Sequence, residues 1–233
     1  MLLIEQHKQC CMCCSLTVQQ HYATMSESAT TTKPCRITFI CTADVNVDSS
    51  HPSPLTARGE LMARCLSSSM IDICHLPVIG EVDDHQPPVA FCSPDPSSIR
   101  MVEILAGRFT KRVKQVDWLD EVDVDDVDSI RQSTTSAIEQ LSTLVQMYEN
   151  RAVLLITHPL RIKYIFDALR IAQHFLPMPC STSTITMWRA DRELRFSVHT
   201  LGDMCGVVGG GFRCHELHVY KASVMYTLPD VFT

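Results

Sequence analysis

Short apolar runs alternate along this chain with longer segments in which apolar residues recur every three or four positions. The runs at residues 36–41, 89–93 and 151–157 have the length and composition of buried strands. Four segments show helical spacing instead: residues 53–68, 96–109, 129–150 and 160–172. Such alternation is typical of proteins in which helices cover both faces of a largely parallel sheet. We therefore expect an α/β fold, a three-layer sandwich with a mostly parallel central sheet.

The run AVLLIT (152–157) is uncharged on both faces, which predicts a strand in the middle of the sheet. Residues 113–119 predict a further strand, and residues 181–200 predict two closing strands joined by a short charged turn. Thr56 is expected to cap the helix of residues 53–68. The side chains of that helix expected on its inner face are Leu61, Met62, Cys65 and Leu66.

The two ends of the chain depart from this pattern. Residues 1–34 are rich in Cys, Ser and Thr and lack an apolar period, so they predict a flexible lead-in. Residues 35–204 predict one domain, and residues 205–233, which contain a glycine-rich stretch, predict a C-terminal extension. Both ends are candidate contact surfaces for protein partners.

Charge and hydropathy exclude some classes of partner. The net charge of −6 makes a nucleic acid an unlikely main ligand. No apolar run approaches the roughly 18–20 residues that span a bilayer. The first twenty residues make a poor secretory signal because Glu5, His7 and Lys8 interrupt them. We expect an intracellular protein, cytoplasmic by default, with mitochondrial import left open.

The chain has twelve cysteines, most of which we expect to be free thiols that pack as small apolar residues. Four of them gather near the start of the chain: Cys10, Cys11, Cys13 and Cys14. A zinc site normally needs a second, equally clear Cys-x2-4-Cys unit, and none is evident. We expect no metal and no other cofactor. Zinc binding, lipidation and a partner-facing tail are the readings left open for this cluster.

In a parallel sheet, functional sites form where strands end and helices begin. Two junctions of this kind stand out, Cys41–Asp44 and Thr157–Arg161. The first follows a buried strand and the second leads directly into a helix. They are the candidate site.

Several segments resemble, in the same order, the histidine phosphatase or phosphoglycerate-mutase-like superfamily. ITFICTAD sits where the family has a strand followed by Arg-His-Gly-Glu, and PLTARG matches its Pro-Leu-Thr-x-x-Gly helix start. VAFCSP resembles the strand ending in Ser-Ser-Pro, WLDEVDVDD the Leu-x-Glu segment that carries an acid, and VLLITHPL the second histidine strand. The match covers Arg36 to Asp203. This resemblance implies the phosphoglycerate-mutase-like fold and phosphoryl transfer through a phosphohistidine.

Carried over by position, however, the resemblance leaves the catalytic residues missing. The family's nucleophilic histidine falls on Thr42, and the arginine before it falls on Cys41. The second phosphate-binding arginine falls on Ser97. What survives is the second histidine, His158, and Glu121 for the acid.

These losses predict a pseudoenzyme with no catalytic residues. A threonine hydroxyl needs an adjacent base to act as a nucleophile, and its phosphoester would be too stable to turn over. Each lost charged donor typically removes about 2–4 kcal/mol of transition-state stabilisation. We therefore expect an inactive protein that serves as a structural or interaction subunit of a larger assembly.

Two alternatives are left open. The first is a phosphatase with a rearranged site that uses His158 and Glu121, together with His51 or His199. The second is a non-catalytic sensor of a small phosphoester. Its three expected ligands are His158, Lys163 and Arg58. Lys163 takes the place of the basic residue that the family carries five positions after its second histidine.

Overall fold

The computed structural model describes residues 32–46, 53–74, 88–106, 113–122, 126–172, 175–190 and 193–204. The strands are β1 (Cys35–Cys41), β2 (Val89–Cys92), β3 (Val113–Gln115), β4 (Ala152–Thr157), β5 (Thr182–Ala190) and β6 (Glu193–Asp203). The helices are α2 (Ala57–Cys74), α3 (Pro96–Ala106), α4 (Val127–Met147) and α5 (Pro159–Ala168), with a 3-10 turn, η1 (Asp117–Leu119). Most of the lead-in, all of the predicted extension and the cluster from Cys10 to Cys14 lie outside these residues.

Within the described residues the strands form a six-stranded sheet in the order β3-β2-β4-β1-β5-β6. The β3, β2, β4 and β1 strands are parallel to their neighbours, whereas β5 runs antiparallel to both β1 and β6. The central place predicted for β4 is confirmed, since β4 pairs with β1 on one side and β2 on the other. Its residues from Val153 to Thr157 are all buried, as a strand covered on both faces requires.

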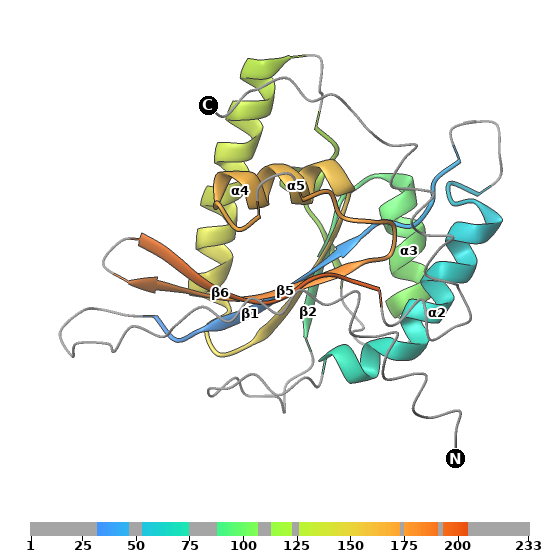
Figure 1. Cartoon of the computed structure of the whole chain (residues 1–233), viewed down its shortest axis with the longest axis horizontal. Helices are drawn as coiled ribbons and strands as arrows, with labels where there is room; N and C mark the ends of the chain where they lie inside the picture. The colour runs from blue at the N-terminus through green and yellow to red at the C-terminus, as the bar shows by residue number, and fades with distance from the viewer. Residues whose placement is uncertain are drawn as a thin grey trace.

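Helices cover both faces of the sheet, so the predicted three-layer sandwich is confirmed (Figure 1). Alternate residues of β1 point to opposite sides, as the pleat of a strand dictates. Ile37 and Phe39 pack into the core beneath α4 and α5. Ile40 packs into the core beneath α2 and α3, together with Ile156 of β4.

The start of α2 follows the sequence prediction, because the Thr56 hydroxyl accepts a hydrogen bond from the Gly59 N–H at 2.9 Å. Its inner face is different from the predicted one. Leu61 is 53% exposed, so its inward placement was wrong. The residues that carry the inner face recur every three or four positions: Met62, Ala63 and Leu66. Leu61 lies outside this stripe, because one residue turns an α-helix by about 100°.

The strand predicted over residues 113–119 was too long. It ends at Gln115, and the chain then turns through η1. Among the described strands, β3 pairs with β2 alone and lies at the edge of the sheet. Leu119 does not continue the alternation of buried and exposed residues that a strand would show, because its side chain is fully buried. Its carbonyl accepts a hydrogen bond from the Thr157 hydroxyl. This contact with the end of β4 requires the chain to leave the sheet before Leu119.

Candidate functional site

The candidate site lies at the carboxyl edge of the three neighbouring strands β1, β4 and β2. Cys41 pairs with Thr157 across β1 and β4, so the two predicted junctions lie side by side. Backbone hydrogen bonds continue the pairing beyond the strands. The N–H of Thr42 donates to the Thr157 carbonyl at 2.9 Å, and the N–H of Ser93 donates to the Ile156 carbonyl at 3.1 Å. The segments that follow the three strands therefore meet at one place, as expected for parallel neighbours.

His158 stands at the start of α5, in the N-cap position before Pro159. Only 7% of this residue is exposed. Its Nε2 lies 3.4 Å from Oδ2 of Asp95, which is longer than an ordinary hydrogen bond. Within the described part of the chain, Nε2 has no hydrogen-bond partner. The surviving histidine therefore faces a carboxylate.

Asp95 occupies the N-cap position of α3 and is held by several groups. Its Oδ2 accepts a hydrogen bond from the Ser98 N–H at 3.0 Å and another from the Ser97 hydroxyl. Burial raises the pKa of Asp95, but the contacts with His158, Ser97 and the Ser98 N–H outweigh it and hold the pKa well below its usual range. Asp95 is therefore negatively charged at neutral pH.

Sequence reasoning missed Asp95 as a site residue. One local signal was available, since an aspartate directly before Pro96 is typical of a helix start. That signal predicts the capping bonds only. The approach of His158 depends on how α3 and α5 meet at the sheet edge, which no local pattern encodes.

At the end of β1 the predicted positions Cys41 and Thr42 are both buried. Cys41 is fully buried and faces the core under α4 and α5. Burial, and after it the neighbouring Cys180, raise the pKa of the Cys41 thiol well above its ordinary value, so it stays protonated. Thr42 is 3% exposed. The Cys180 N–H lies 3.2 Å from the Cys41 carbonyl and 3.3 Å from that of Thr42, so the turn before β5 closes over this strand end.

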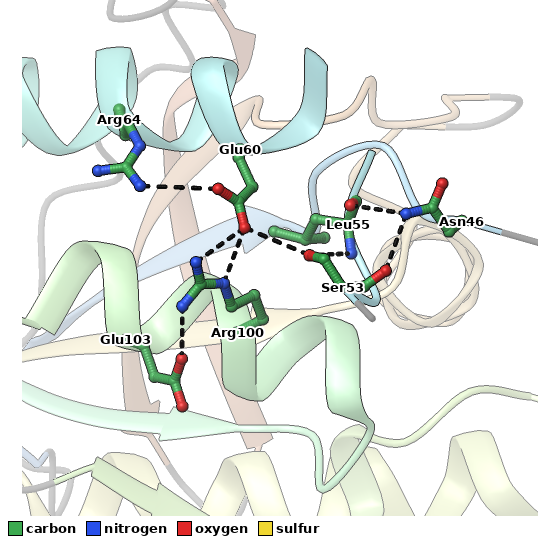
Figure 2. A network of polar contacts seen from close by, with 7 residues as sticks. All are labelled: Asn46, Ser53, Leu55, Glu60, Arg64, Arg100 and Glu103. Atoms are coloured by element: carbon green, nitrogen blue, oxygen red, sulfur yellow. Dashed lines mark hydrogen bonds and ion pairs between the residues drawn. The ribbon is translucent and has the colours of Figure 1, made fainter. Parts of the chain in front are cut away.

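Ser97, at the position of the second arginine, is buried and bound to Asp95. The arginine that α3 does carry, Arg100, is directed to α2 (Figure 2). Its Nε and Nη2 donate to Oε1 of Glu60 at 3.0 and 2.8 Å, and its Nη1 donates to Glu103 at 2.9 Å. Glu60 also accepts the Ser53 hydroxyl at 3.3 Å, which ties in the loop after β1. This guanidinium is engaged between the two helices.

A second carboxylate, Asp120, reaches the site from the turn after η1. It accepts the Ser93 hydroxyl at 3.0 Å, and its carbonyl accepts Nε of Arg161 at 2.9 Å. Glu121, the predicted acid, is exposed, and its backbone N–H donates to Oδ1 of Asp120 at 2.9 Å. Burial lowers the pKa of Arg161, which is 2% exposed.

The other predicted phosphate ligands lie on two helices, α5 and α2. Lys163 lies on α5 with its amino group on the carboxylate of Asp167, one turn further along the helix. Arg58 is half-buried in the first turn of α2. His51 lies outside the described residues. These positions stay predictions, with His158 the one that the structure places directly at the meeting point of the strand ends.

His199, an alternative catalytic residue, lies on β6 toward the opposite end of β1. Its Nε2 is 2.7 Å from the Thr186 hydroxyl, and Thr186 pairs with Arg36 at the start of β1. Burial, and after it Arg36, lower the pKa of His199. From Arg36 to Cys41 a strand rises about 16 Å, at about 3.3 Å per residue. His199 is therefore remote from His158.

The described residues contain no group of three or more His, Cys, Asp or Glu side chains arranged to hold a metal ion. In the same part of the chain, no helix combines the length and the apolar composition needed to cross a membrane.

Comparison with solved structures identifies the fold. YhfR from Bacillus stearothermophilus superposes with a TM-score of 0.55 at 17% identity, covering 74% of this chain and 99% of that one. A phosphoglycerate mutase from Bacillus anthracis superposes with a TM-score of 0.56 at 13% identity, covering 78% of this chain and 98% of that one. A putative alpha-ribazole-5'-P phosphatase from Escherichia coli superposes with a TM-score of 0.53 at 15% identity, covering 73% of this chain and 98% of that one. No protein-family model and no curated protein sequence matches this chain.

At these identities the likeness concerns the fold alone. The chain has the phosphoglycerate-mutase-like α/β fold, which histidine phosphatases and phosphoglycerate mutases share. The resemblance predicted from the sequence is confirmed at that level.

Proposed function

We propose that this protein is a catalytically silent member of the phosphoglycerate-mutase-like fold that acts as a structural or interaction subunit of a larger assembly. The observation that carries the proposal is the 3.4 Å approach of the Asp95 carboxylate to Nε2 of His158. Phosphoryl transfer depends on positive charge around the equatorial oxygens of the phosphoryl group. Here a carboxylate faces the histidine that would hold those oxygens.

The neighbouring residues support the same conclusion. Thr42 would need a base to become a nucleophile, and Cys41 is kept protonated by burial. Ser97 binds Asp95, and Arg100 binds Glu60 and Glu103, so the first two turns of α3 direct no guanidinium toward His158. The buried arginine at this edge, Arg161, binds the Asp120 carbonyl through its Nε at 2.9 Å.

The role in an assembly is supported by what the chain retains. The sheet and both of its helical layers are complete, with fully buried side chains such as Phe39 and Met101 in the two cores. A stable scaffold does not require a working site, and a protein that binds other proteins needs the scaffold alone. A structural or interaction subunit would need its folded core but not a working site.

The assembly can be tested by gel filtration of the native protein from a gentle lysate. We expect it to elute well above the 26.2 kDa of the single chain. A His158→Ala variant is expected to elute at the same position, because the interaction does not use the site. Elution of the wild-type protein as a monomer at cellular concentration would argue against a subunit role.

A further inference from the structure

Three polar groups from two different helices approach one oxygen of Asp95, two of them as hydrogen-bond donors. Oδ2 receives the Ser97 hydroxyl, the Ser98 N–H at 3.0 Å and, at 3.4 Å, the Nε2 of His158. The first two contacts are those of an ordinary N-cap in α3. The third is different, because His158 belongs to α5 and reaches Asp95 across the edge of the sheet.

The donors around this oxygen make a place for an anion. A buried polar nitrogen normally has a partner, and Nε2 of His158 has no closer one than Asp95 among the described residues. The N-terminus of α3 adds the N–H groups of its first turn and the positive end of a helix dipole. These groups favour a negatively charged partner, and the Asp95 carboxylate of the protein itself supplies that charge.

We infer that the carboxylate of Asp95 is an internal ligand, which occupies an oxyanion site formed by Ser97, Ser98 and His158. In the wild-type protein this carboxylate excludes inorganic oxyanions. Removing it opens the site to them. The inference rests on the proposed function, because it supplies a physical reason that the site stays silent. The place for an anion is filled by Asp95, and Cys41 and Ser97 stand at the family's two arginine positions.

The Asp95 carboxylate lies between solvent and His158. The Asp95 side chain is 26% exposed, whereas that of His158 is 9% exposed, so an ion from solvent would enter at the position of the carboxylate and meet the imidazole behind it. To bind in the wild-type protein, phosphate would have to displace Asp95 and lie beside its charge. Like charges at such short range repel strongly in a partly desolvated site.

The test compares the phosphate dependence of thermal stability in the wild-type protein and in an Asp95→Ala variant. Inorganic phosphate is titrated at neutral pH, with sodium chloride holding the ionic strength constant. We expect the thermal unfolding midpoint of the Asp95→Ala variant to rise as phosphate is added. The unfolding midpoint of the wild-type protein is expected to stay constant. The apparent Kd of the variant is expected to be at least about tenfold lower, a change of about 1.4 kcal/mol.

Asp126 offers a matched control, because its carboxylate also caps a helix, accepting the Asp128 N–H at 3.0 Å at the start of α4. Asp126→Ala loses a cap of the same kind but no contact with a histidine, and its midpoint should not respond to phosphate. Adding His158→Ala to Asp95→Ala should abolish the response. Should Asp95→Ala fail to fold, Asp95→Asn removes the charge while keeping a capping oxygen.

Two results would overturn the inference. One is phosphate binding by the wild-type protein as tight as that of the variant, which would mean that Asp95 does not fill the site. The other is a folded Asp95→Ala or Asp95→Asn variant that does not respond to phosphate. Neither result bears on turnover, so the inference can fail while the protein remains inactive.

Discussion

Replacing Phe39 with alanine is expected to lower the free energy of unfolding by about 3–5 kcal/mol. Phe39 is fully buried in the middle of β1, the strand that ends at the candidate site. Its ring meets that of Phe166 on α5 edge-on, with centroids 5.1 Å apart and planes at 87°. The substitution therefore leaves a cavity between the central strand and the helix that carries His158.

Urea unfolding measured by circular dichroism gives the loss directly. Phe39→Leu is the matched control, since it keeps most of the apolar volume and should cost far less than the alanine variant. A loss below about 1 kcal/mol for Phe39→Ala would contradict the position of β1 at the centre of the sheet.

Replacing Gly59 with alanine is the second change for which we expect a large effect, a loss of about 1–3 kcal/mol. A Cβ at this position would lie 2.3 Å from the carbonyl oxygen of Asp44, which is backbone and cannot rotate away. The same carbonyl accepts the Thr56 N–H at 3.0 Å. The added methyl group would force α2 away from the segment that follows β1.

The effect of Gly59→Ala can be separated from helix propensity, because alanine is the better helix former of the two. Ser68→Ala, at an exposed position of the same helix, is a suitable control and should change stability by less than about 0.5 kcal/mol. If Gly59→Ala were as stable as the wild-type protein in urea unfolding, the close packing of α2 on Asp44 would be wrong.

The sequence predicted those parts of the molecule that depend on local pattern. The continuous apolar run of β4 predicted its central place, and Thr56 predicted the start of α2. The side-by-side position of Thr42 and His158 followed from one general property of parallel sheets. Periodicity was less reliable at element edges, where Leu61 faces solvent and β3 ends at Gln115.

The contacts that decide the charge of the site were beyond local pattern. Asp95 could be recognised as a helix cap, but its neighbour His158 comes from another helix. Arg100 could be counted as an arginine on α3, but its direction toward Glu60 depends on how α2 and α3 pack. Both are tertiary contacts between residues far apart in the chain, set by the arrangement of helices over the sheet.

The central claim is that the protein does not catalyse phosphoryl transfer. The most direct measurement is the hydrolysis of p-nitrophenyl phosphate by the purified wild-type protein, beside an active histidine phosphatase as a positive control. We predict no release of product above the rate without protein, and the same result for His158→Ala. Turnover by the wild-type protein that disappears in His158→Ala would contradict the claim, because it would show a working site built around that histidine.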